Sequence, residues 1–125
     1  MNVRQLFLLI AAVGLIPIAL SYGVTPQKSL NFLFGIDASA KNSRHIFRAL
    51  MGLYLALALF WIMGALDVQL RQASLYSFVV FMLGLAAGRI LSIMVDGLPH
   101  WLLVVYLGLE ICFGAIGLAL LINWD

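Results

Sequence analysis

The sequence predicts an all-α integral membrane protein that folds as a single transmembrane four-helix bundle over residues 1–125. Of its 125 residues, 65% are hydrophobic and only 10% are charged, whereas soluble domains have about 45–50% apolar and about 25% charged residues. The apolar residues gather in four runs of about 20 residues, the length that crosses a bilayer as a helix. Short polar breaks separate these runs, so the length leaves no room for a soluble domain.

The first apolar run covers residues 6–22 and resembles the apolar core of a signal peptide. However, Ser21-Tyr22-Gly23 is a poor cleavage site, because such sites carry small residues. We therefore interpret the run as a retained transmembrane helix and expect a kink at Pro17, since proline removes a backbone hydrogen bond.

The connection after the first span, residues 23–44, is the only long one. Within it, residues 29–36 are too few to span a membrane and too apolar for a solvated loop. An interfacial or re-entrant segment fits this pattern, and a short loop packed on the helix ends is the alternative. Asn42 or Ser43 is expected to cap the next helix.

The remaining spans are expected at residues 45–66, 73–95 and 101–122. A tight polar turn over residues 67–72 joins the second span to the third. A second turn over residues 96–100 follows the third span, because its glycine permits positive φ and its proline stops the helix.

Four spans place both termini on one side of the membrane, and the connections 23–44 and 96–100 on the other, which we call the mouth side. The positively charged residues of the connections and termini are shared almost equally between the two sides, so the positive-inside rule leaves the orientation open. The basic residues form no cluster, which argues against a nucleic-acid partner.

Three charged residues within the spans share the mouth-side half of the bilayer. At 1.5 Å rise per residue, Arg48 lies about 5 Å, Arg89 about 10 Å and Glu110 about 14 Å below the mouth-side helix ends. Charges at such depth should face the bundle interior or a wet cavity and should pair. Glu110 is therefore the best partner for Arg89, although similar depth alone does not prove that their faces meet.

This asymmetry favours a polar cavity that opens on one side and binds a lipid or a small amphipathic anion. If Glu110 pairs with Arg89, Arg48 keeps donors for a carboxylate or phosphate. The further candidate ligand-binding residues lie on the Arg89 helix face, at the rim or within reach of the cavity: Ser92, Asp96, His45, His100, Tyr54 and Tyr106. The histidines and Asp96 show no metal-ligand spacing, so neither a metal nor another cofactor is expected.

Two other functions remain open. In an accessory membrane subunit, the same charges would fix the helices in register. In a membrane enzyme, Glu110 or a histidine would act as acid or base on a lipid-like substrate. Gly84 and Gly88, four residues apart, would permit close helix contact in a homodimer. The single cysteine excludes an intrachain disulfide.

Two sequence elements and Glu110 resemble a bacterial family of small four-helix membrane proteins of unknown function, DUF4345. The elements are His45-Ile-Phe-Arg-Ala-Leu-Met-Gly-Leu-Tyr54 and Gly88-Arg-Ile-Leu-Ser-Ile-Met-Val-Asp-Gly-Leu-Pro99. The resemblance covers essentially the whole chain and implies a four-span bundle in a bacterial cytoplasmic (inner) membrane. The chain looks more distantly similar to DoxX-like four-helix proteins, which include redox-associated membrane subunits. A shared architecture does not transmit function, so no activity follows from either resemblance.

Overall fold

The computed structural model describes residues 2–124 and contains five helices within that range. They are α1 (Val3–Gly23), α2 (Pro26–Phe34), α3 (Lys41–Leu66), α4 (Val68–Asp96) and α5 (Trp101–Ile122). The four long helices have the length and apolar composition of membrane spans. The protein is thus an integral multi-pass membrane protein with an all-α bundle, as the sequence predicts.

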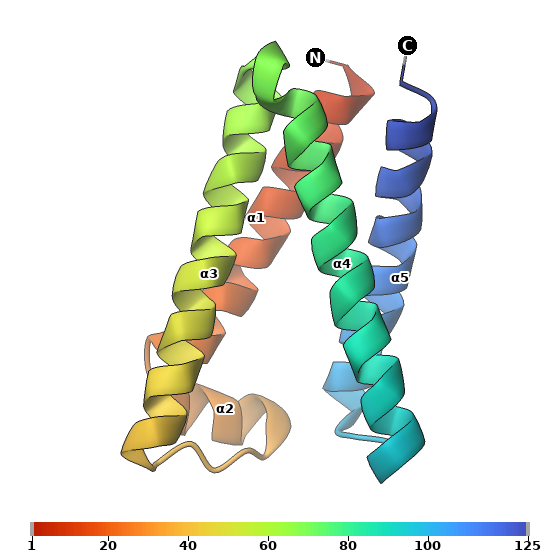
Figure 1. The fold of residues 1–125 in the computed structure, drawn as a ribbon. Coiled ribbons are helices and arrows are strands. Elements are labelled where there is room, and N and C mark those ends of the chain that lie inside the picture. The colour runs from red at the N-terminus through yellow and green to blue at the C-terminus, as the bar shows by residue number, and fades with distance from the viewer. Residues whose placement is uncertain (1, 125) are drawn as a thin grey trace.

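Both ends of the chain lie at the same end of the bundle, and α2 and the connection from α4 to α5 lie at the opposite end (Figure 1). This arrangement confirms the predicted topology and identifies the second end as the mouth side. The short α2 lies across the mouth side of the bundle, at a steep angle to the long helices (Figure 1).

The core is centred on α1, which packs along the length of α3. Leu8, Ala12 and Ala19 of α1 are fully buried, and Ala58 and Trp61 of α3 are buried with them. Small side chains at this interface let the two helices approach closely. The helix α1 continues through Pro17 without interruption.

The junction between α3 and α4 consists of Asp67 alone, so the predicted turn over residues 67–72 is wrong. The carboxylate of Asp67 accepts a hydrogen bond from the amide of Gln69 at 2.9 Å and thereby caps α4. Arg71 lies buried in the first turn of α4 and donates to the carbonyls of Gly64 (3.1 Å) and Ala65 (3.0 Å). The polar run therefore satisfies backbone groups at the helix ends instead of forming a loop.

From this junction, α3 and α4 separate towards the mouth side (Figure 1). Near the junction they are in tight contact, because a Cβ at Gly64 would overlap the side chain of Ser74. Further along, α4 packs on α5, where a Cβ at Gly114 would come within 2.8 Å of Leu83. The bundle is thus closed near the junction and wider at the mouth side.

The segment between α1 and α3 contains a short helix, α2, rather than only a loop. Pro26 begins α2, and Gly35, with φ of 69°, ends it in the left-handed conformation. Leu30 and Phe34 point into the bundle and are buried. Apolar side chains of this segment were expected to be buried, and one face of the short helix α2 buries Leu30 and Phe34.

The predicted cap of the second span at Asn42 or Ser43 is wrong, because α3 begins earlier, after Ala40. An Asx turn precedes it: Asp37 Oδ1 accepts hydrogen bonds from the amide (3.1 Å) and the hydroxyl (2.7 Å) of Ser39. These two hydrogen bonds lower the pKa of the Asp37 carboxyl below its ordinary value.

Candidate functional site

Arg89 of α4 and Glu110 of α5 form an ion pair inside the bundle. The Nε atom of Arg89 donates to both carboxylate oxygens of Glu110, at 2.8 and 3.1 Å. The side chains are 21% and 9% exposed, respectively. The pairing inferred from depth is confirmed, and it joins the two helices that form one half of the bundle.

The two terminal nitrogens of Arg89 make no hydrogen bond to Glu110, and the Tyr22 hydroxyl lies within hydrogen-bonding reach of the guanidinium. A guanidinium carries five N–H donors, of which four are on these nitrogens. The carbon of the guanidinium also lies 5.8 Å from the ring centre of Tyr106, within cation–π distance. Glu110 thus leaves donors of Arg89 for a further acceptor besides the Tyr22 hydroxyl.

Tyrosine side chains from α1, α3 and α5 gather around the ion pair. The rings of Tyr22 and Tyr54 pack edge to face with centres 5.4 Å apart, and both side chains are buried. Their hydroxyl groups lie near Arg89 and Glu110. Three phenol groups, including that of Tyr106, are therefore gathered around one salt bridge.

A cavity of about 130 Å³ adjoins the ion pair between α1, α4 and α5. Its walls are mainly apolar, and its polar groups are the ion pair and the tyrosines. The residues that line it are Ile10, Ala11, Gly14, Leu15, Ile18, Tyr22, Tyr54, Phe78, Phe81, Met82, Leu85, Arg89, Tyr106, Leu109, Glu110 and Phe113.

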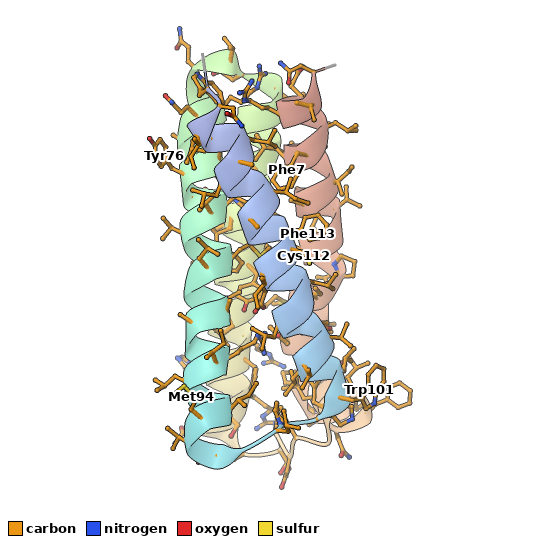
Figure 2. All side chains as sticks on the ribbon, turned by 90° about the vertical axis from the view of Figure 1, so that its right-hand side faces the viewer. Phe7, Tyr76, Met94, Trp101, Cys112 and Phe113 are labelled. Atoms are coloured by element: carbon orange, nitrogen blue, oxygen red, sulfur yellow. The ribbon has the colours of Figure 1, made fainter. Side chains whose placement is uncertain are left out.

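The outer edge of this cavity lies between α1 and α5. Ile10 and Leu109, which line it, are 51% and 46% exposed. At the end away from the mouth, the rings of Phe7 and Phe113 meet between α1 and α5, with centres 6.0 Å apart (Figure 2). The cavity is therefore accessible from the side of the bundle, where the bilayer would lie.

The mouth-side end is covered by α2. The ring of Phe34 packs against those of Tyr106 and Tyr22, with centres 5.8 and 6.2 Å apart. Among the described residues, none that lines the cavity comes from α2. The expected opening towards the mouth is thus covered, because one apolar face of the short helix fills it.

A second, wider space of about 560 Å³ lies between the diverging halves of α3 and α4. We call it the α3–α4 groove. It is lined by Leu50, Leu53, Tyr54, Val80, Phe81, Gly84, Leu85, Gly88, Arg89 and Ser92. Gly84 and Gly88 thus line a groove on the outer side of the monomer, and the homodimer through them stays a prediction.

The structure brings four of the predicted site residues together and disperses the others. The four predicted residues that line the cavity are Arg89, Glu110, Tyr54 and Tyr106. Ser92 lines the groove but not the cavity. Arg48 instead donates through Nε to the carbonyl of Gly23, 3.2 Å away, at the end of α1. It thereby satisfies a helix-terminal carbonyl and lies outside both spaces.

The predicted rim residues lie apart from the ion pair. His45 and Asp96 are exposed near the mouth-side ends of α3 and α4. His100 precedes α5, and its Nδ1 atom accepts a hydrogen bond from the amide of Leu102 at 3.2 Å. That histidine therefore caps a helix, with its ring against Phe34.

Tyr22 is the site residue that the sequence analysis did not single out. The signal for it was the spacing of buried residues on α1, where Leu8, Ala12, Leu15, Ala19 and Tyr22 recur every three or four residues. This spacing places them on one helix face. The tyrosine at the end of that face therefore had to point into the bundle.

A family model described as a domain of unknown function (DUF4345) matches residues 3–121. The chain belongs to the DUF4345 family. The match extends from the start of α1 almost to the end of α5, so it includes every residue of the site. Comparison with curated proteins and with solved structures gives no significant match. The chemistry of this DUF4345 protein must therefore be argued from its site.

Proposed function

We propose that the protein binds an amphipathic molecule whose anionic head group contacts Arg89 and whose apolar part occupies the adjacent cavity. The observation that carries the proposal is the geometry of the ion pair. Glu110 engages only Nε of Arg89, so the terminal nitrogens, with the Tyr22 hydroxyl beside the guanidinium, retain N–H donors at the polar end of an apolar space. A planar fork of N–H donors suits a carboxylate or a phosphate.

The tyrosines support the same class of ligand. A head group beside Arg89 would lie close to the hydroxyls of Tyr22 and Tyr54, which donate hydrogen bonds to oxygen acceptors. Such donors offset the repulsion between an anionic head group and the Glu110 carboxylate. Hydrogen bonds of this kind gain strength where water is excluded.

The cavity has the size of a small apolar group. An engineered cavity of about 150 Å³ in another protein holds benzene, and the volume here is about 130 Å³. A ring or a short stretch of an acyl chain fills such a space. The rest of a longer chain would leave between Ile10 and Leu109 and enter the bilayer.

The depth of Arg89 suits a ligand supplied by the membrane. The 29 residues of α4 rise about 44 Å, which matches a bilayer of about 40–45 Å including its head-group regions. Arg89 lies about 10 Å from the mouth-side end of α4. That position is only a few ångströms below the boundary between head groups and hydrocarbon, close to the level at which lipid head groups lie.

The test is binding of lauric acid to the purified protein, measured by titration in native mass spectrometry. The informative variant is the double variant Arg89→Leu/Glu110→Leu, because it removes the fork without leaving a buried unpaired charge. Arg48→Leu is the matched control, since Arg48 lies on the same side of the bundle but outside both spaces. We expect about a tenfold or greater loss of affinity in the double variant alone, equivalent to about 1.4 kcal/mol.

The accessory-subunit role is the second candidate, and the ion pair between α4 and α5 favours it too. Such a pair fixes the register of two helices whose packing lacks a hydrophobic driving force in lipid. Equal binding of lauric acid to wild type and double variant would contradict the binding function. A loss of stability in Arg89→Leu without any change in ligand binding would then assign the pair to assembly.

A further inference from the structure

We propose that the natural occupant is a two-chain anionic lipid, with its head group at Arg89, one chain in the cavity and the other in the α3–α4 groove. This inference rests on the proposed function and names its ligand class. It starts from the fact that Arg89 lines both spaces. One head-group site therefore serves two apolar spaces.

The two spaces are neighbours separated by a narrow ridge of side chains. Tyr54, Phe81, Leu85 and Arg89 line both of them. Phe81, Leu85 and Arg89 are spaced four residues apart, so they form one continuous row along α4. Arg89 is the last of this row towards the mouth side. Two chains that diverge from a head group at Arg89 would pass on either side of the row.

The apolar lining and the open space of the groove suit an acyl chain. The groove is shallow and open on its outer side, as a site for a chain that stays in contact with the bilayer would be. Apart from Arg89, Ser92 and the phenol of Tyr54, its lining residues are apolar. A Cβ at Gly84 or Gly88 would meet no atom within 4 Å. The two glycines therefore leave space along α4 that no neighbouring side chain fills.

The surrounding bilayer is the source that the geometry favours. The α3–α4 groove faces the side of the bundle in its mouth-side half, the cavity extends from Arg89 past the middle of the bundle to Ile10 and Phe78, and the mouth itself is covered by Phe34. The charge at the meeting point is a guanidinium whose terminal nitrogens do not engage Glu110, and such donors complement a phosphate. A lipid of the mouth-side leaflet has its phosphate near the level of Arg89 and its chains directed towards the bilayer centre, along α4.

Glycine substitutions can fill each space separately. A leucine at position 14 fills the cavity, and a leucine at position 88 fills the groove, because a Cβ at either glycine meets no atom within 4 Å. Gly52→Leu is the matched control, since Gly52 is equally open but lines neither space. None of these changes replaces a residue of the ion pair.

The experiment measures the affinity of each variant for phosphatidylglycerol and for its one-chain lyso form by native mass spectrometry. Gly14→Leu and Gly88→Leu should each weaken binding of the two-chain lipid about tenfold, equivalent to about 1.4 kcal/mol. Each single variant should bind the one-chain lipid with the affinity of the wild type, because one space remains open. The double variant Gly14→Leu/Gly88→Leu should lose both lipids, and Gly52→Leu should bind both like wild type.

Wild-type affinity of Gly88→Leu for the two-chain lipid would overturn this inference. So would a dimer of the wild type that Gly88→Leu dissociates without any change in lipid binding, because a second copy would then occupy the groove. Neither result affects the proposed function, which fails only if Arg89→Leu/Glu110→Leu binds the one-chain anions as well as wild type does.

Discussion

Glu110 receives two hydrogen bonds from Arg89, and both come from the single Nε atom, at 2.8 and 3.1 Å. In a fork-to-fork pair, by contrast, two nitrogens of the guanidinium bind the two oxygens. The pair through Nε joins α4 to α5, and the four N–H donors on the terminal nitrogens remain uninvolved with Glu110. One residue thus serves both the stability of the bundle and the proposed site.

Removing one partner of this pair should destabilise the bundle more than removing both. Arg89→Leu leaves Glu110 buried and unpaired, which costs about 3–5 kcal/mol in a fully buried pair. Because Arg89 is 21% exposed, we expect the lower part of that range. The double variant Arg89→Leu/Glu110→Leu should recover most of the loss. Unfolding free energies measured by steric trapping in bicelles provide the test, and additive losses would show that the two residues are not coupled.

Gly64→Ala should destabilise the junction of α3 and α4. The added methyl group would overlap the Ser74 side chain, which is held by a 2.9 Å hydrogen bond to the carbonyl of Phe60. Overpacking of this kind costs about 1–3 kcal/mol. Gly52→Ala is the control, because its Cβ meets open space and alanine favours helices by up to about 1 kcal/mol. Thermal unfolding in detergent should show a lowered midpoint temperature for Gly64→Ala and not for Gly52→Ala.

The topology predicts which positions face the same side of the membrane. Single cysteines at Ser39 and Leu98 on the mouth side, placed in a Cys112→Ser background, should share one pattern of labelling. Cysteines at Gln69 and Asn123 should show the opposite pattern. Labelling of sealed vesicles with a membrane-impermeant maleimide makes the comparison. Joint labelling of positions 39 and 69 from one side would contradict the four-span topology.

Asp37 should titrate below its ordinary pKa of 3.8, because the ionised carboxylate accepts two hydrogen bonds from Ser39. A lowered folded-state pKa means that this stabilisation is complete above the ordinary pKa and is lost as the pH falls through the lowered one. Carboxyl NMR titration of the protein in micelles measures the value. Ser39→Ala should raise the pKa towards 3.8, whereas Ser43→Ala should leave it unchanged.

The fold was predictable because length and apolar runs decide where a membrane chain spans. Residues 101–122 were predicted as a span and form α5, and the other spans lie within α1, α3 and α4. The helix ends were less predictable, since tertiary contacts set them. Arg71, for example, reads as part of a polar turn in the sequence but caps the carbonyls of α3 from inside α4.

The site was predictable only in part, because depth follows from the sequence whereas the facing direction of a side chain depends on packing. Arg89 and Glu110 were matched by depth, and their faces meet. Arg48 lies at a suitable depth too, but the close approach of Gly23 to Met51 brings the end of α1 beside it. Its guanidinium therefore donates to a backbone carbonyl, a contact that no pattern in the sequence indicates.

Because the junction at Asp67 is a single residue, α4 is held in place at that end and any change in its angle is largest at the other end. Arg71 and the Ser74 contact anchor α4 to α3 near that end. A rotation of about 5° there would move the far end of a 44 Å helix by about 4 Å. That displacement is close to the thickness of one hydrocarbon chain. The residues of α4 that line the α3–α4 groove, Val80 to Ser92, lie about 18–36 Å along the helix from the junction, so the width of the groove is sensitive to small angular changes at a distant site.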